Sequence, residues 1–288
     1  MTATVIDGRA ASTTIRSSLR DSARRFASER DAPPTIAVVF VGSDPPSERY
    51  ARQIKREFER NDFGVVQHRL GEDTPESEVT GLLADLGANP AIHGVLVEMP
   101  LPPHVSVERV SLAIPVAKDV DGVHPINAGF LFSNSGSFFA PATPSGGIAL
   151  LEHIGASVRG KRAVVIGRSA SVGKPMAFML LHRDATVTIC HSHTADLESI
   201  VGQADILVAA AGVPRLVQGE WLRPGAIVID FGASVVGDSV VGDVEYESAL
   251  EVAGAITPVP GGTGPMTVTM LMKNTLMAAQ RTFPSLTR

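Results

Sequence analysis

Cysteine, aromatic residues and long apolar runs are scarce in this chain, and each scarcity excludes a class of protein. The 288 residues include one cysteine, Cys190, so an internal disulfide is impossible and a reducing compartment is expected. No apolar run is long enough to span a membrane, and the N-terminal segment MTATVIDGRA lacks the apolar core of a signal peptide. We therefore expect a cytoplasmic protein without a membrane partner.

Positive charge is not in excess either. The formal net charge is −5, which gives no basic surface for nucleic acid. The eight histidines are scattered, and no Cys/His group has the spacing of a metal site. A chain of this length, with 44% hydrophobic and 19% charged residues, predicts one large or two medium globular domains.

The most informative stretch is KRAVVIGRSASVGKP, residues 161–175. Residues 163–166 form a short β-branched apolar run, which is typical of a buried strand. The run ends at Gly167, and Gly173 precedes an apolar segment with Pro175 near its start, which predicts a helix. A strand, a glycine-bounded turn and a helix N-terminus together predict an anion site.

Two phosphate-binding motifs compete for this turn. The P-loop requires four residues between its glycines and a hydroxyl residue after the lysine, whereas here five residues intervene and Lys174 precedes a proline. The dinucleotide fingerprint also departs, because Arg168 and Ser169 replace the second glycine. Taken alone, the turn fits a cofactor loop and an ordinary strand-to-helix turn equally well.

Three further apolar runs, residues 185–191, 204–212 and 224–232, favour the cofactor loop. Their spacing leaves room for short helices and predicts a doubly wound parallel sheet with its ligand at the carboxyl ends of the strands. After the second strand, where an NAD site usually has an acid, His191 and Ser192 stand instead. With Arg168 and Ser169 in the first turn, this pattern favours NADP, although solvated polar residues at a strand end would look the same.

The N-terminal half predicts a separate α/β domain. Strands are expected at residues 35–41, 65–70 and 93–99, with helices at 6–29, at 75–86 and along the segment from Tyr50 toward Gly64. A last helix, from residue 268 with Thr267 as its N-cap, is expected to pack back onto this domain. We therefore predict two α/β domains, residues 1–139 with 268–288 and residues 140–267, separated by a cleft. The polar, turn-prone segments 118–122 and 141–144 are expected to line that cleft.

Seven segments in order resemble the methylenetetrahydrofolate dehydrogenase/methenyltetrahydrofolate cyclohydrolase family. They are VGSDPPSERY, PLPPH, KDVDG with INAG, PATPSG, VVIGRSASVGKP, TICHSHT and TPVPGGTGPMT, and they extend from about residue 41 to 275. The resemblance implies a folate-binding first domain, a Rossmann-like NADP-binding second domain and a homodimer. It also implies oxidation of 5,10-methylenetetrahydrofolate, followed by hydrolysis to 10-formyltetrahydrofolate.

The resemblance also suggests roles for individual residues. Tyr50 matches the tyrosine that stacks on the folate, and Asp121 matches the carboxylate that accepts hydrogen bonds from the pterin. From the local sequence alone, Tyr50 could equally be a core tyrosine and Asp121 a turn residue. The remaining matches are a folate-site loop and a set of cofactor contacts: Pro260, Gly261, Gly262 and Pro265 for the loop; Thr143, Gly167, Arg168, Ser169, Gly173, His191 and Ser192 for the cofactor.

Two departures concern the residues to which the family's hydrolysis is assigned. The family's lysine, four residues after the tyrosine, is here Ile54, and a lysine follows as Lys55; the family's glutamine before the PLP motif is Glu98. We count Lys55 and Glu98 as candidate catalytic residues with Tyr50 and Asp121. The combination predicts a dehydrogenase with weak or absent cyclohydrolase activity.

Several alternatives remain open at this point. A locally distorted helix could return Lys55 to the site of a fully bifunctional enzyme, or Glu98 could itself act as the base. A two-domain dehydrogenase of a hydroxy or amino acid would need a catalytic pair that the sequence does not place. A non-enzymatic folate or NADP sensor is the remaining class.

Overall fold

The computed structural model describes residues 2–282, which form two compact units with separate parallel sheets. The three-stranded unit contains Thr14–Ala142 and the chain from Val268; the six-stranded unit contains the residues up to Thr13 and Thr143–Thr267. Among the described residues, no helix is both long and apolar enough to cross a membrane.

The sheet of the three-stranded unit has the order β3-β2-β4, and both pairings are parallel. Its strands are β2 (Thr35–Val41), β3 (Gly64–Leu70) and β4 (Gly94–Val97). Its helical elements are α1 (Gly8–Arg30, from Thr14), α2 (Pro45–Arg60), α3 (Glu76–Ala88), α4 (Val107–Ala113), the 3₁₀ turn η1 (Val116–Lys118), α5 (Pro125–Ser133) and the part of α10 (Thr263–Thr282) that follows Thr267.

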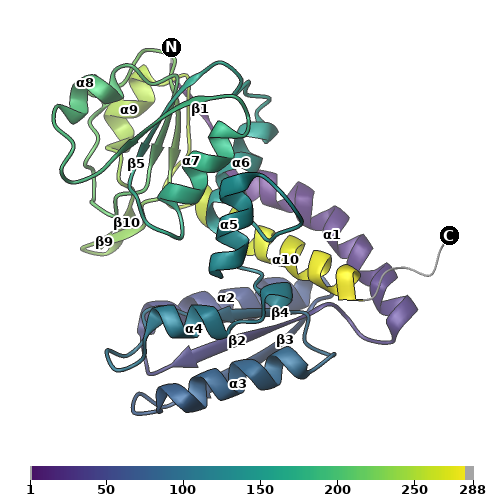
Figure 1. Cartoon of the computed structure of the whole chain (residues 1–288). Coiled ribbons are helices and arrows are strands. Elements are labelled where there is room, and N and C mark those ends of the chain that lie inside the picture. The colour runs from purple at the N-terminus through teal and green to yellow at the C-terminus, as the bar shows by residue number, and fades with distance from the viewer. Residues whose placement is uncertain (1, 283–288) are drawn as a thin grey trace. The chain divides into compact units, whose positions relative to one another are not determined.

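The central strand β2 is buried along almost its whole length, as its uninterrupted apolar sequence requires. Alternate residues of β2 and β4 pack with α3 and α4 in one cluster on one face of the sheet. Helix α2 covers the other face (Figure 1), where Ile54 and Phe58 are fully buried. The carboxyl ends of β2 and β4 therefore open at the same edge of the sheet, beside the first turn of α2.

The sheet of the six-stranded unit has the order β1-β11-β8-β7-β5-β6, with every pairing parallel. Its strands are β1 (Thr4–Val5), β5 (Arg162–Ile166), β6 (Thr186–Cys190), β7 (Ile206–Ala209), β8 (Ile227–Asp230) and β11 (Ala255–Ile256), and a hairpin is formed by β9 (Ser234–Val236) and β10 (Ser239–Val241). Its helical elements are α6 (Ala142–His153, from Thr143), α7 (Gly173–Leu181), α8 (Leu197–Val201), the 3₁₀ turn η2 (Gly219–Trp221), α9 (Tyr246–Val252) and the start of α10.

Helices cover both faces of this sheet. Helices α8 and α9 pack with Val164, Leu207 and Val228 in one cluster (Figure 1). On the other face, Gly147 of α6 lies so close to Ile229 that a β-carbon would be only 3.4 Å from its side chain. This is the doubly wound parallel arrangement predicted for the C-terminal domain, and the two-domain α/β class is confirmed.

Three details of the predicted organisation were wrong. The first thirteen residues belong to the six-stranded unit, because Thr4–Val5 pairs with Ala255–Ile256; a two-residue strand is too short to show any periodicity. Helix α10 begins at Thr263, because Pro265 is tolerated in a first turn. Thr267 therefore lies inside the helix and is not its N-cap. The PATPSG segment is not a turn but the start of α6. The predicted C-terminal helix extended to residue 288, and residues 283–288 lie outside the described chain.

Candidate functional site

The six-stranded unit brings three predicted cofactor segments to one edge of its sheet. Ile166 pairs with Cys190 on one side and with Ala209 on the other, so β5, β6 and β7 end at the same level. Gly167 and His191 follow directly, and the Gly167 N–H donates to the Cys190 carbonyl at 2.9 Å. The carboxyl edge of a parallel sheet is where ligands bind in doubly wound folds.

The turn after β5 is shaped by its two glycines. Gly167 has a φ of +124°, and a β-carbon there would collide with the Ala210 carbonyl. At Gly173, a β-carbon would collide with the Gly167 carbonyl. Both positions therefore require glycine, and the N-terminus of α7 comes directly against the end of β5.

Ser169 has a structural part in this turn. Its Oγ accepts hydrogen bonds from the N–H groups of Val172 and Gly173, both at 3.2 Å, and so satisfies two donors at the start of α7. Arg168, by contrast, is exposed, and His191 is partly exposed. The His191 backbone N–H donates to Thr194 Oγ1 at 2.8 Å, which fixes the polar turn after β6.

These residues fit a phosphorylated dinucleotide. Arg168 supplies a guanidinium, the helix start supplies backbone N–H groups, and the turn from His191 to Thr194, which includes Ser192, contains no carboxylate. Asp196 is the first acid after β6. A 2′-phosphate would therefore meet donors and no opposing charge at this turn.

A buried pair of acids at the same edge was not predicted from the sequence. Asp230, at the end of β8, accepts hydrogen bonds from the N–H groups of Gly232, Asp243 and Val244 at 2.7–3.1 Å. Asp243 Oδ2 accepts from the N–H groups that follow β7, at 2.6 and 2.8 Å. Burial and then the nearby Asp243 charge raise the pKa of Asp230 to about 6, against the lowering effect of its backbone donors. The signal available in the sequence was Asp230 at the end of an apolar strand.

The predicted folate-site loop is anchored to the same strand end. Thr257 Oγ1 accepts from the Asp230 N–H at 2.8 Å, and the Thr263 hydroxyl donates to the Asp230 carbonyl at 2.9 Å. Gly261 has a φ of +117°, and a β-carbon on Gly262 would lie 2.6 Å from Thr257 Cβ. The loop is therefore anchored at both ends, by Thr257 and Thr263, which flank five residues. Pro260 is exposed, and Pro265 lies in α10. Thr143 lies at the start of α6, with its hydroxyl oxygen 3.4 Å from that of Thr267.

In the three-stranded unit, Tyr50, Glu98 and Asp121 form one electrostatically linked group. Glu98 follows β4, and its N–H donates to the Val39 carbonyl at 2.9 Å, which places it at the carboxyl edge of the sheet. Tyr50 lies in the first half of α2, whose start is fixed by Asp44: its Oδ2 accepts from the Ser47 N–H at 2.9 Å. The Ser47 hydroxyl oxygen lies 2.8 Å from the Met99 carbonyl, which ties α2 to the segment that follows Glu98.

Asp121 is positioned by its buried neighbours. The Lys118 ammonium donates to the carbonyls of Leu86 and Asn89 at 2.9 and 2.7 Å. Asp119 is fully buried and accepts from the N–H groups of Val123 and His124. The KDVDG segment was expected to line a cleft, but its first two residues are internal anchors; Asp121 itself is only partly buried.

Burial and nearby carboxylates raise the pKa values of all three groups. Burial, then Asp121 and Asp44, raise the pKa of Glu98 to about 8. Burial and the charge of Asp119 raise the pKa of Asp121 to about 7, although the Ala142 N–H opposes that shift. The pKa of Tyr50 is raised well above its usual value by burial and then by the two acids. Perturbed acids that cluster at the edge of a sheet are typical of a functional site.

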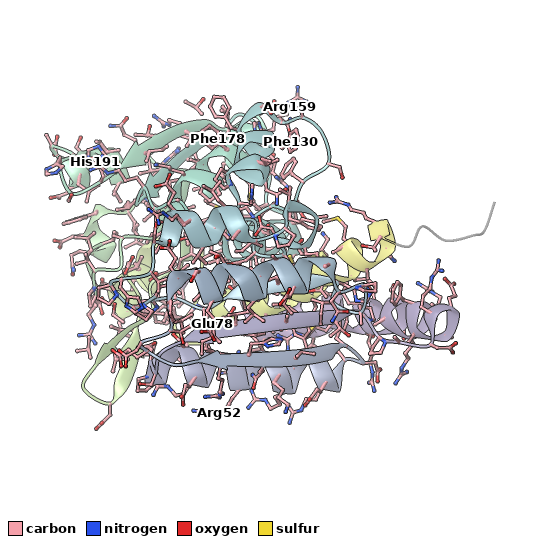
Figure 2. The ribbon with its side chains drawn as sticks, turned by 60° about the horizontal axis from the view of Figure 1, so that its bottom comes forward. Arg52, Glu78, Phe130, Arg159, Phe178 and His191 are labelled. Atoms are coloured by element: carbon pink, nitrogen blue, oxygen red, sulfur yellow. The ribbon has the colours of Figure 1, made fainter. Side chains whose placement is uncertain are left out.

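The structure does not bring Lys55 into this group. Helix α2 is unbroken from Pro45 to Arg60, so Tyr50 and Ile54 share one face, and Ile54 is fully buried. The Lys55 side chain is 51% exposed and its Nζ lies 3.8 Å from Glu59 Oε1. Figure 2 shows Arg52, one turn before Lys55, on the outside of this helix.

Comparison with known proteins gives consistent matches along the whole chain. Residues 6–121 match the model of the tetrahydrofolate dehydrogenase/cyclohydrolase catalytic domain, and residues 141–283 match that of the corresponding NAD(P)-binding domain. The bifunctional protein FolD 2 of Geobacter sulfurreducens is 48% identical over 279 residues, which cover 96% of this chain and 97% of that protein. Bifunctional protein FolD of Moorella thermoacetica is 47% identical, with 98% and 100% covered.

Two solved structures share the fold closely. The bifunctional enzyme FolD of Campylobacter jejuni, a methylenetetrahydrofolate dehydrogenase/cyclohydrolase, has a TM-score of 0.95 at 38% identity, covering 97% of this chain and 99% of its own. The Trypanosoma brucei enzyme, solved with NADP cofactor and an inhibitor, also has a TM-score of 0.95, at 35% identity with 99% and 100% covered.

Proposed function

Because this chain belongs to the tetrahydrofolate dehydrogenase/cyclohydrolase family, we propose that it oxidises 5,10-methylenetetrahydrofolate with NADP and hydrolyses the methenyl product slowly or not at all. The dehydrogenase assignment and the cofactor follow from the family and from the fit of the turn after β5 to a phosphorylated dinucleotide. The weak hydrolysis is the finer part of the proposal, and it depends on helix α2.

The observation that carries this finer part is the burial of Ile54 beside the exposure of Lys55. Attack of water on the methenyl carbon requires a group that accepts a proton or polarises the water. Lys55 lies on the outer face of α2, about 100° around the helix from Ile54, and cannot serve there. Hydride transfer mainly requires two rings held at the right distance and angle, so it does not depend on this lysine.

The folate-binding roles are assigned to the acid–tyrosine group. In this proposal Tyr50 stacks on the folate, and Asp121, when ionised, accepts hydrogen bonds from the pterin amino group and ring nitrogen. The loop from Pro260 to Pro265 contributes to the folate site. NADP is held by Arg168, Gly173, His191 and Ser192, with Thr143 near the nicotinamide; bound there, it supplies the hydride acceptor. The protein is also proposed to be a cytoplasmic homodimer.

A fully bifunctional enzyme is the second candidate, and the names of the relatives favour it. Relatives of 46–48% identity along almost the whole chain are called bifunctional proteins. In that case the hydrolytic proton acceptor would be Glu98 rather than a lysine, because Glu98 is buried with its pKa near neutrality.

A coupled assay separates the two candidates. NADPH formation and loss of the methenyl chromophore are followed together on purified protein supplied with 5,10-methylenetetrahydrofolate. The proposal predicts that methenyltetrahydrofolate accumulates while NADPH forms; equal rates would establish the bifunctional enzyme. Glu98→Gln then identifies the base, since hydrolysis that disappears in this variant would assign the role to Glu98. A protein that binds both ligands and forms no NADPH would be a sensor.

A further inference from the structure

One buried oxygen of the site is left without a partner. Glu98 is 8% exposed, and among the described residues no group hydrogen-bonds its Oε1. It lies in a small pocket at the carboxyl edge of the sheet, together with Asp44, Ser47 and Pro100. A buried carboxyl oxygen without a donor or a counter-charge is costly when it is ionised. The charge of ionised Glu98 would therefore have to be compensated by a bound ligand.

We propose that ionised Glu98 is a catalytic residue of hydride transfer, and that it makes the site selective for the cationic methenyl form over neutral folates. The inference rests on the proposed dehydrogenase function and adds the group that compensates the charge of the product. A neutral glutamine at this position could not supply that charge.

The chemistry creates a positive charge where the site lacks one. As the C–H bond of the methylene carbon breaks, the hydrogen leaves with both electrons to the nicotinamide, which is reduced. The folate is oxidised, and its N5–C–N10 unit becomes an amidinium cation. A carboxylate nearby interacts more strongly with this developing cation than with the neutral substrate, so it lowers the barrier itself. The proton of Glu98 leaves to solvent when the carboxyl group ionises.

The groups that face Glu98 leave it without a protein counter-charge. From the start of α2 come Asp44, Glu48 and Tyr50, and from the segment after η1 comes Asp121, whose carboxyl group is in turn repelled by Asp119. Arg69 of β3 also lines the pocket, but its Nη1 lies 3.2 Å from Glu48 Oε1.

The Arg69 guanidinium also lies over the Phe40 ring, 5.3 Å from the ring centroid. The raised pKa of Glu98 agrees with this environment of acids. A cationic ligand would reverse the balance and favour the ionised form.

Proton release on binding gives a direct test without NADP. Calorimetry at pH 6.5, in two buffers of different ionisation enthalpy, counts the protons released when 5,10-methenyltetrahydrofolate or neutral 10-formyltetrahydrofolate binds. Asp121 contributes to both ligands, so the difference between them reports Glu98. We expect the cation to release up to about one proton more than the neutral folate in the wild type, and no excess in Glu98→Gln. Equal release of protons by both ligands in the wild type would refute the inference.

Steady-state kinetics supply the second test, with Glu59→Gln as the matched control. Glu59 is an exposed carboxylate of the same helix face as Lys55, outside the buried group. At pH 9, Glu98→Gln should lower kcat for NADPH formation by about tenfold or more with KM for the neutral substrate nearly unchanged, whereas Glu59→Gln should change neither.

The pH profile distinguishes the inference from the proposed function. The wild-type kcat should rise with pH toward a plateau, and Glu98→Gln should lack that rise. A wild type that forms NADPH with the same kcat as Glu98→Gln at every pH would disprove the inference and leave the dehydrogenase intact. A wild type that forms no NADPH would instead disprove the proposed function.

Discussion

Ile54 and Lys55 are neighbours in α2 with opposite environments: Ile54 is fully buried, and the Lys55 ammonium lies in solvent beside Glu59. A one-residue displacement of a lysine along a helix moves its side chain by about 100°. The side chain on the Tyr50 face is thus an apolar core residue, while Lys55 joins a surface of arginines and glutamates.

Lys55→Ala should leave both activities within about twofold of the wild type. The side chain is half exposed and its ion pair with Glu59 is a weak surface contact, so the free energy of unfolding should change by less than about 0.5 kcal/mol. Parallel measurement of NADPH formation, methenyl hydrolysis and urea unfolding checks this. A tenfold loss of hydrolysis alone would show that Lys55 reaches the site.

Ile54→Lys combined with Glu98→Gln should increase hydrolysis relative to NADPH formation. Burial at position 54 lowers the pKa of a lysine and favours the neutral amine that a base requires, and removal of the carboxylate avoids holding it as ammonium. The same burial should cost roughly 2–4 kcal/mol of unfolding free energy. Ile54→Met with Glu98→Gln is the control, because it lacks the amine; if it hydrolyses equally well, the lysine is irrelevant.

Arg168→Ala should narrow the preference for NADP over NAD. We expect the wild type to prefer NADP by at least about tenfold in kcat/KM, which is roughly 1.4 kcal/mol and within the reach of one charge-assisted contact. Lys174→Ala, which removes an exposed cation from the first turn of α7, provides a comparison. Equal kcat/KM values for the two cofactors in the wild type would show that Arg168 does not contact a 2′-phosphate.

Asp121 should make folate affinity depend on pH. Its pKa is raised to about 7, and only the ionised form offers a pair of acceptors to the pterin donors. Folate affinity should therefore fall as pH drops below about 7, by up to tenfold per pH unit, while NADP affinity stays level. Asp121→Ala should weaken folate binding at all pH values and leave NADP binding nearly intact. Loss of NADP affinity in calorimetry would indicate instead a structural turn residue.

Glu98→Gln should stabilise the protein at alkaline pH. Because the folded-state pKa, about 8, lies above the usual 4.5, the folded protein holds a proton that the unfolded chain releases. Wild-type stability contributed by Glu98 is thus fully present below about pH 4.5 and is lost as pH rises to about 8. The free energy of unfolding of the variant minus that of the wild type should be roughly 1–3 kcal/mol larger at pH 9 than at pH 4.5. Urea unfolding at the two pH values measures this change. If variant and wild type differ in unfolding free energy by the same amount at both pH values, Glu98 is in contact with solvent.

The sequence predicts the strands well because buried parallel strands are short apolar runs with clear ends. Residues 35–41 and 163–166 show this pattern, and the structure has strands there. Strand β1 escaped notice because two residues carry no period, and its partner is supplied by residues 255–256. The start of α10 was misplaced because Gly264 and Pro265 normally indicate a loop, although both are tolerated in a first turn.

The candidate site shows a similar division. Motifs predict Tyr50, Asp121 and the turn after β5 as candidates, because these residue types are selected by chemistry or by backbone geometry. The anchoring roles of Lys118, Asp119 and Asp243 depend on hydrogen bonds to distant backbone groups, which no local pattern reveals.

The pairing of β1 with β11 joins residues that are about 250 positions apart, and this has a consequence for synthesis. At roughly 5–20 residues per second, the ribosome needs on the order of ten seconds or more between making Thr4 and making its partner Ala255. The first segment must wait during that time, while the strands of the three-stranded unit are made and can pair. An N-terminal fusion partner would be attached to the strand that docks late, so its linker should be long and polar enough not to compete for the open edge of β11.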